Sequence, residues 1–294
     1  MAAKKLLLAA LLGIAPAHLA AEARAQTLTQ MANALIRAYP DHLEAFDGTS
    51  LIWKDGTKMP MSDGNDKKTP DELINRPDIK DMFTWPYIFG GQGLPSAKGS
   101  DPGRIRNLPF FEKMYGSCTA RTLNGCGGVS CKLAGRIVSV PWVPAFGGGS
   151  IKATTVNGID KALAAVSAGL ERLGAAYKRY LVPPGGGFFP RCIAGTSRLS
   201  VHSFGIAFDI NPAYGGYWQY GLGTGVTEQS FDETNRPLIY KNKIPLEIVE
   251  IFERHGFIWG GNWYHFDGMH FEYRPEFKAL AEILQAETRQ TQER

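Results

Sequence analysis

The sequence predicts an α+β fold, and three observations indicate it. Apolar residues recur at helical spacing in stretches such as 28–39, 159–177 and 244–256. Short apolar runs of strand length, such as 136–143 and 206–210, lie between polar and glycine-rich turns. The strand-like and helix-like stretches do not alternate regularly, which argues against a parallel α/β sheet.

The first 25 residues have the pattern of a secretory signal peptide. Lys4 and Lys5 precede the short apolar stretch LLLAALLGIA, and the sequence Ala-Arg-Ala stands directly before Gln26 as a cleavage site. No stretch approaches the ~18 consecutive apolar residues of a spanning helix, so we expect no membrane anchor. The first cysteine, Cys118, is far from the cleavage site, which argues against a lipid anchor. We therefore expect an exported protein, either periplasmic or secreted.

The charge of the chain does not favour a nucleic-acid partner. The formal net charge is +4, and the leader accounts for half of it because it holds three cations and one carboxylate. The mature protein is thus only weakly positive, whereas proteins that bind nucleic acids usually carry a strong basic patch. We expect a monomer that binds no nucleic acid.

Composition divides the mature chain at the glycine-rich stretch FGGGS, residues 146–150. Residues 26–149 are expected to form a loop-rich N-terminal extension. Their central part, from Gly64 to Gly128, is rich in Pro, Gly, Asp and Lys and has only weak periodicity. Residues 150–294 are expected to form a second domain.

Regular elements are expected in the extension, but they are short. The periodicity predicts a helix over 28–39, which Pro40 ends. A hairpin is expected around Asp55 and Gly56, because Asp-Gly is a favoured two-residue hairpin turn. The run of β-branched residues at 136–143 predicts a strand.

The second domain contains the clearest helix of the chain. Its apolar residues follow alternating steps of four and three from Ile159 to Tyr177, with Asn157 as the expected cap. Another helix is expected between Pro245, near its first turn, and Gly256, just past its end. A final amphipathic helix is expected in the stretch RPEFKALAEIL.

The four cysteines predict two disulfides. Cys118, Cys126, Cys131 and Cys192 form an even set in a chain that we expect to be exported. A structural zinc site is the alternative, but it usually shows paired two-residue spacings that are missing here. Of the three pairings, we favour Cys126–Cys131, which closes a short loop around two glycines, together with Cys118–Cys192.

The stretch SRLSVHSFGIAFDIN predicts half of a metal site. His202 and Asp209 are seven positions apart, and on a straight strand this odd separation would point their side chains to opposite faces. A bend at 203–205 would bring them together, because the glycine of this tripeptide tolerates the positive φ of a tight turn. Asp209 lies between apolar neighbours and is costly to bury without a compensating cation.

The stretch FDGMHFEY supplies the missing ligand. It holds Asp267 and His270 on either side of Gly-Met, and a strand here would place His270 and Glu272 on one face. Taken alone, His270 fits an ordinary structural histidine better. Together with His202 and Asp209, however, it forms a His-Asp-His set that suits zinc and leaves a fourth position open for water.

Two neighbouring residues have simpler interpretations. Ser200 lacks the G-x-S-x-G surroundings of a nucleophilic serine, so we interpret it as a hydrogen-bonding residue beside the metal ligand His202. His265 stands next to Trp263 and Tyr264 and is interpreted as a packing or surface residue.

Two blocks of the sequence together resemble a known family. The first is S-x-H-x-x-G-x-A-x-D, from Ser200 to Asp209, and the second is W-G-G-x-W…D-x-M-H-F-E, from Trp259 to Glu272. They resemble, in order and in internal spacing, the signature blocks of the M15 zinc peptidases. That family includes D-alanyl-D-alanine carboxypeptidases and dipeptidases, and the L-alanyl-D-glutamate endopeptidases of phage lysins.

The resemblance covers roughly residues 150–280 and implies a fold. A small antiparallel sheet flanked by helices would carry the zinc site, as in the D-Ala-D-Ala peptidases and the hedgehog signalling domain. The residues before about 150 match no signature block. Two of their stretches, LIWKDGTKMP and DPGRIRNLPFFEKMYG, resemble an extension of some exported members.

The resemblance also implies roles for individual residues. It implies that three residues bind Zn²⁺: His202, Asp209 and His270. The acidic residue three positions before the last ligand is the family's base, which is Asp267 here. An arginine upstream of the first block contacts the substrate in the family, and Arg191 is the best match, with Arg198 as the alternative.

Further residues are expected to border the substrate. Three are candidates for substrate binding: Arg198, Ser200 and Trp263. Four aromatic residues are candidates for the walls of a groove for a peptidoglycan stem peptide, with core packing as the alternative for each: Tyr217, Trp218, Trp259 and Trp263.

The resemblance implies a zinc-dependent peptidase that cleaves peptidoglycan stem peptides in cell-wall remodelling or recycling. The activity would be that of a D-Ala-D-Ala carboxypeptidase or a related endopeptidase. The alternative is a non-catalytic zinc-containing module that binds the cell wall, since the hedgehog domain shares the ligands. The presence of both Asp267 and Arg191 favours an enzyme. The leader disfavours a phage-type lysin, because many lysins reach the wall through a holin.

Overall fold

The computed structural model describes most of residues 26–294. The described residues are 26–91, 98–120, 128–133, 135–193, 196–220, 222, 226, 231 and 238–293. The predicted leader over 1–25 and Cys126 lie outside them. Among the described residues, no helix is both long and apolar enough to cross a membrane.

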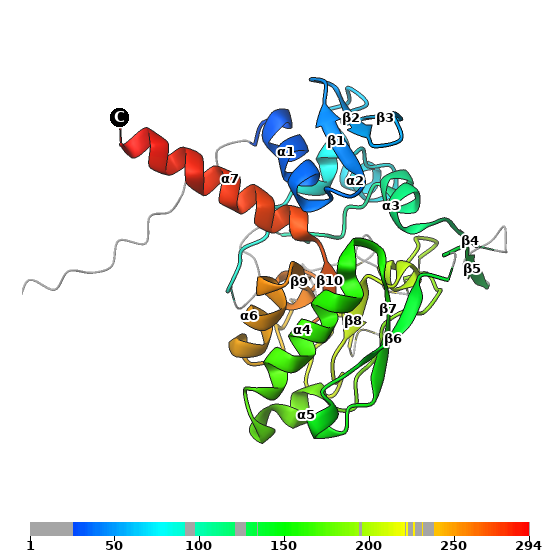
Figure 1. Cartoon of the computed structure of the whole chain (residues 1–294), viewed down its shortest axis with the longest axis vertical. Coiled ribbons are helices and arrows are strands. Elements are labelled where there is room, and N and C mark those ends of the chain that lie inside the picture. The colour runs from blue at the N-terminus through cyan, green and yellow to red at the C-terminus, as the bar shows by residue number, and fades with distance from the viewer. Residues whose placement is uncertain are drawn as a thin grey trace, which may run out of the picture.

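The described residues form a mixed α+β fold with small antiparallel sheets, as predicted (Figure 1). The α-helices are α1 (Leu28–Ala38), α2 (Pro70–Asn75), α3 (Leu108–Tyr115), α4 (Ile159–Glu171), α5 (Lys178–Leu181), α6 (Leu246–Arg254) and α7 (Pro275–Gln292). The strands are β1 (Leu43–Phe46), β2 (Ser50–Trp53), β3 (Lys58–Pro60), β4 (Cys118–Ala120), β5 (Val129–Cys131), β6 (Ile137–Pro141), β7 (Ser150–Thr154), β8 (Ala207–Asp209), β9 (Phe257–Trp259) and β10 (His270–Tyr273). They pair in the orders β1-β2-β3, β4-β5, β6-β7 and β8-β10-β9.

The N-terminal part contains the helix and the hairpin that the sequence predicts. α1 begins after Thr27, whose side chain accepts the amide hydrogen of Gln30 in a capping box. β2 and β3 form the hairpin whose turn includes Asp55 and Gly56. α1 also packs on α7 (Figure 1), so the N-terminal part is held against the last helix of the chain.

The expected domain boundary at 146–150 lies in the turn of a hairpin. β6 and β7 pair without interruption from Ile137 opposite Thr154 to Pro141 opposite Ser150. The chain on one side of the turn therefore pairs with the chain on the other side. One hydrophobic core also contains buried residues from both parts, among them Leu35, Phe110, Ile151 and Phe252. The division into an extension and a domain stays a prediction.

α4 is shorter than expected, and its cap differs. The helix ends at Glu171, and Tyr177 lies in a separate 3₁₀ turn. Asn157 does not cap α4, because its backbone is left-handed with φ of 56° and Gly158 stands between it and the helix. Its side-chain amide instead donates to the Tyr115 hydroxyl at 3.1 Å, which ties the start of α4 to α3.

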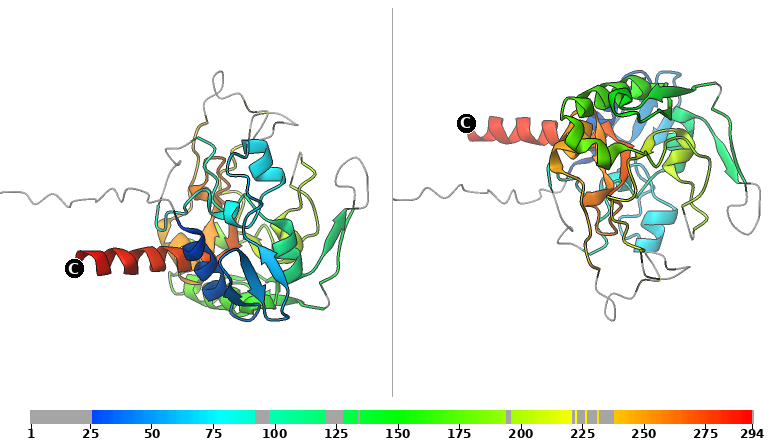
Figure 2. Two further views of the ribbon diagram at one scale, coloured as in Figure 1. Left: turned by 90° about the horizontal axis from the view of Figure 1, so that it is seen from above. Right: turned by 90° about the horizontal axis from the view of Figure 1, so that it is seen from below.

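α6 and α7 lie where the sequence predicts helices, although α7 continues beyond the predicted stretch to Gln292. α6 follows Pro245 and ends before Gly256, whose φ of 85° turns the chain into β9. α6 packs on β9, and α4 packs on α6, β6 and β7. α7 begins directly after β10, and its C-terminal end projects from the body of the molecule (Figure 2).

The favoured disulfide pairing is wrong. Cys118 is bonded to Cys131, because the hairpin of β4 and β5 places these residues opposite each other, with their Cα atoms 4.0 Å apart. Cys118 therefore does not pair with Cys192, and Cys131 does not pair with Cys126. Cys192 is also disulfide-bonded, and no cysteine of the described residues is free. The three described cysteines, Cys118, Cys131 and Cys192, are thus oxidised, which argues against a structural zinc site at them.

Candidate metal centre

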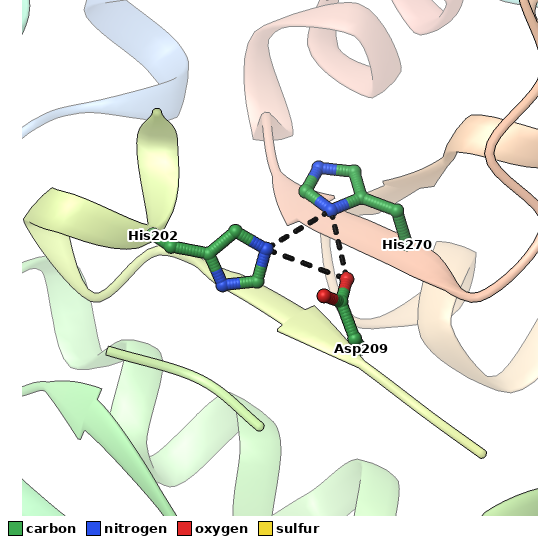
Figure 3. A group of neighbouring side chains, drawn as sticks. All are labelled: His202, Asp209 and His270. Carbon is green, nitrogen blue, oxygen red and sulfur yellow. Dashed lines mark hydrogen bonds and ion pairs between the residues drawn. The ribbon is translucent and has the colours of Figure 1, made fainter. Parts of the chain in front are cut away.

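Two strands and one turn bring three ligand-type side chains together. In the pairing of β8 with β10, Asp209 lies directly opposite His270, so the two side chains stand on the same face of the sheet. His202 comes from a 3₁₀ turn, Val201–Phe204, that leads into β8. Figure 3 shows the three side chains pointing toward one another.

The bend expected between His202 and Asp209 is present. Ser200 caps the 3₁₀ turn, since its hydroxyl accepts the amide hydrogen of His202 at 3.4 Å. Gly205 ends the turn with φ of 71°, and a Cβ there would lie 2.8 Å from Cδ1 of Ile137. Only glycine fits this position without strain. His202 therefore lies in a turn and not in the strand that holds Asp209, so the alternation of side chains along a strand does not place the two on opposite faces.

The converging atoms have the spacing of ligands around one ion. His202 Nε2 lies 3.2 Å from His270 Nδ1 and 3.4 Å from Asp209 Oδ1. His270 Nδ1 lies 3.0 Å from the same carboxylate oxygen. Ligands at ~2.0–2.1 Å from a tetrahedral zinc are about 3.3 Å apart. The three side chains therefore fit a single zinc ion.

In each histidine, the ring nitrogen that faces away from the other two side chains contacts a hydrogen-bond acceptor. His202 Nδ1 lies 2.8 Å from the carbonyl oxygen of Gly187, which can only accept, so Nδ1 carries the proton. His270 Nε2 lies 3.4 Å from Oε2 of Glu272. Both rings can thus present an unprotonated nitrogen to the centre, and such outer contacts are typical of metal-bound histidines.

Contacts within the site shift the pKa values of Asp209 and His270 in opposite directions. Burial raises the pKa of Asp209, but His202 and His270 outweigh burial and hold it well below its usual range, so the carboxylate is ionised. Burial lowers the pKa of His270, but hydrogen bonds to Asp209 and Glu272 outweigh burial and raise it to about 9. Metal binding at neutral pH must therefore displace a proton from His270.

A buried chain of charges supports His270 from behind. Glu272 is fully buried and lies 2.6 Å from Arg106 Nη2 and 3.1 Å from Arg274 Nη1. Burial raises its pKa, but Arg106, the contact with His270 and Arg274 together hold it well below its usual range. Arg274 also pairs with Glu276, which accepts a 2.7 Å hydrogen bond from the Tyr39 hydroxyl. The charge chain thus reaches from the end of α1 to a candidate metal ligand.

Gly103, which precedes α3 in the sequence, contacts this network of buried charges. The carbonyl of Gly103 accepts a hydrogen bond from Arg274 Nη1 at 2.9 Å. Gly103 has φ of 91°, and a Cβ there would lie 2.5 Å from Ile258 Cδ1 and 2.8 Å from Glu272 Oε1. A larger residue would push this segment away from the charge chain.

Sequence reasoning missed the contribution of residues 101–106. His265 is buried, so of the two expected alternatives it is a packing and not a surface residue, and its Nδ1 lies 2.6 Å from Oδ2 of Asp101. The guanidinium carbon of Arg104 lies 4.7 Å from the centroid of the Trp263 ring. One feature of the sequence could have indicated this contribution. Arg104 and Arg106 are two positions apart, so an extended segment would present both side chains on one face.

A pocket of about 290 Å³ opens at the three ligand-type side chains. It is lined by five of the residues expected near the substrate or the metal: Arg191, Ser200, Tyr217, Trp263 and Asp267. Arg104, Arg106 and Tyr220 also line it and were not expected from the sequence. Tyr220 is 61% exposed, so its ring stands at the edge of the pocket rather than in the core.

Three other candidates are not among the described residues that line this pocket. Trp259 is fully buried and donates from Nε1 to the carbonyl of Gly268 at 2.8 Å, so it is a core residue. Trp218 is buried edge-on against His265, with ring centroids 4.7 Å apart. Arg198 lines a neighbouring cavity instead.

The carboxylate of Asp267 is buried in the pocket beside the three ligand-type side chains. Its Oδ1 is buried and has no hydrogen-bond partner among the described residues. Burial raises its pKa to about 6, although the His270 ring opposes this rise. An unpartnered buried carboxylate oxygen is costly, and a hydrogen-bond donor at the metal centre would satisfy it.

Two imidazoles, one carboxylate and an adjacent acidic group in an open pocket define a metallohydrolase type of site. Comparison with known proteins agrees with this class. Residues 194–273 match the M15 peptidase family model described as D-alanyl-D-alanine carboxypeptidase. The match covers less than a third of the chain, but it includes the three ligand-type residues and Asp267. No curated protein and no solved structure matches the chain significantly.

Proposed function

We propose that the protein is a zinc-dependent peptidase that cleaves peptidoglycan stem peptides, as a D-Ala-D-Ala carboxypeptidase or a related endopeptidase. One observation carries the proposal: His202, Asp209 and His270 converge in an open pocket beside Asp267, inside the M15 domain. The Cys118–Cys131 disulfide supports an oxidising compartment outside the cytoplasm, in agreement with the predicted leader.

The residues of the pocket have distinct roles in the proposed reaction. A zinc ion held by the three side chains would polarise the scissile carbonyl and supply a hydroxide nucleophile near neutral pH. Asp267 accepts the proton of the attacking water and delivers it to the leaving amine, a role worth ~10²–10⁴ in rate. Arg191 lines the same pocket, and its guanidinium suits a substrate carboxylate or the developing oxyanion.

A non-catalytic wall-binding module is the competing hypothesis. Such a module would retain the metal ligands but would not need a buried, unpartnered carboxylate beside them. The position of Asp267 and the location of Arg191 in the same pocket therefore favour the enzyme.

Digestion of purified peptidoglycan tests the proposal and identifies the bond that is cleaved. The zinc-loaded mature protein is incubated with peptidoglycan, and the released fragments are identified by mass. We expect free D-alanine, cleaved cross-links or cleavage between L-Ala and D-Glu, and no such products with the His202→Ala variant. Zinc-loaded protein that binds peptidoglycan but releases no fragment would support the non-catalytic module.

A further inference from the structure

The first described residue of the chain lies at a small apolar pocket. Gln26, which stands two positions before α1, lines this pocket of about 70 Å³. No described residue that lines it is charged, and its walls include Phe83, Phe277, Leu280 and Leu284. Tyr87 also lines it, but the hydroxyl of this residue donates to Glu253 at 2.6 Å. The pocket therefore suits a compact group without charge.

The side-chain amide of Gln26 gains little from its place in this pocket. Its Oε1 is buried and has no hydrogen-bond partner among the described residues, which is costly for an amide oxygen. The next residue, in contrast, is firmly held. The amide of Thr27 donates to Gln30 Oε1 at 2.8 Å, and the Thr27 hydroxyl accepts from the Gln30 amide at 3.2 Å. The structure thus fixes the backbone directly after Gln26 but does not hold the oxygen of its side chain.

The predicted cleavage site would make the same residue the start of the mature chain. Ala-Arg-Ala stands directly before Gln26, so cleavage there would give Gln26 an α-amine. An α-amine is largely protonated at neutral pH, and a positive charge is unfavourable beside the N-terminus of a helix. The first turn of α1 contains no acidic residue to offset it. The carboxylate of Glu287 on α7 already accepts from Gln30 Nε2 at 2.5 Å.

We propose that cleavage before Gln26 is followed by cyclisation of this residue to pyroglutamate, and that the resulting lactam ring occupies the pocket. The unprotonated α-amine attacks the side-chain carbonyl carbon Cδ, and a new C–N bond closes the ring. The Cδ–Nε2 bond breaks, and Nε2 leaves as ammonia with one proton from the attacking amine. The reaction is intramolecular and needs no co-reactant. It replaces a charged amine by a neutral ring, which suits both the apolar pocket and the start of α1.

The mass of the mature protein tests the modification, independently of the proposed peptidase activity. The chain is produced with its own leader, purified after export and weighed as an intact protein. We expect a chain that begins at residue 26, is lighter than its encoded sequence by one molecule of ammonia, and is blocked to N-terminal sequencing. Gln26→Met, which has a side chain of similar length without an amide, should show its full mass and an open N-terminus. A mature chain that begins with an unmodified Gln26, or at another residue, would overturn the inference.

Removal of the ring by a pyroglutamyl peptidase tests its place in the pocket. We expect removal from the folded protein to be at least ~10-fold slower than from a synthetic pyroglutamyl peptide with the sequence of residues 26–38, because the pocket must first open. Leu284→Ala enlarges the pocket and should speed removal from the folded protein. Ile283→Ala is the matched control, since Ile283 is the neighbouring partly buried residue of α7 and does not line the pocket. Equal rates for protein and peptide, or equal effects of the two variants, would contradict the placement of the ring.

Discussion

Replacing Asp267 by Asn is expected to lower turnover by ~10²-fold or more while zinc content and folding stay as in the wild type. Asparagine has nearly the size and shape of aspartate but cannot accept a proton. Three side chains already supply ligand atoms to the centre, and an open zinc site keeps its fourth position for water. The role that remains for the carboxylate of Asp267 is proton transfer. Peptide cleavage and metal content are measured on the same preparation.

The His202→Ala variant is the matched control for this prediction. It removes a ligand atom, so zinc affinity and activity should be lost together. If Asp267→Asn lost its zinc, Asp267 would be a ligand and the role of Asp209 would need revision. If it retained both zinc and full activity, another residue would be the base.

Replacing Glu272 by Ala is expected to destabilise the fold by about 3–5 kcal/mol. Arg106 and Arg274 both pair with this fully buried carboxylate, and its removal leaves them as buried cations with too little negative charge nearby. Zinc affinity should also fall, by ~10–100-fold, because the contact that orients His270 is lost. Urea denaturation measures the free energy of unfolding, and competition with a chelator measures zinc affinity.

Two further variants separate the effects of charge and orientation. Glu272→Gln removes the charge but retains an oxygen that accepts from His270 Nε2, so it should lose stability while zinc affinity falls less than in Glu272→Ala. Glu282→Gln removes an exposed carboxylate that pairs with Arg37 and should change the free energy of unfolding by only about 0–1 kcal/mol. A Glu272→Ala variant as stable as Glu282→Gln would refute the structural role of the charge chain.

The parts of the fold that the sequence predicted depend on local signals. The helical periodicity and the proline after 28–39 predict α1, and an Asp-Gly turn predicts the hairpin of β2 and β3. The candidate ligands were also found locally, because His202 and Asp209 lie on either side of a glycine bend and His270 lies in a strand-like stretch.

The parts that the sequence did not predict depend on contacts between distant segments. The pairing of Cys118 with Cys131 follows from the register of β4 and β5, which the cysteine spacing does not specify. The contact of Arg106 with Glu272 joins residues 166 positions apart. Periodicity shows which face of a segment is buried, but it does not show which distant segment covers that face.

Zinc removal and reconstitution test the central claim most directly, namely that His202, Asp209 and His270 hold a catalytic zinc ion. The mature protein is stripped with a chelator, and zinc is then added in steps while cleavage of peptidoglycan stem peptides is measured. Stripped protein should be inactive, and activity should return until about one zinc is bound per chain and then stop rising. The His202→Ala variant should not recover under the same conditions. Undiminished cleavage by protein that elemental analysis shows to be free of metal would contradict the claim.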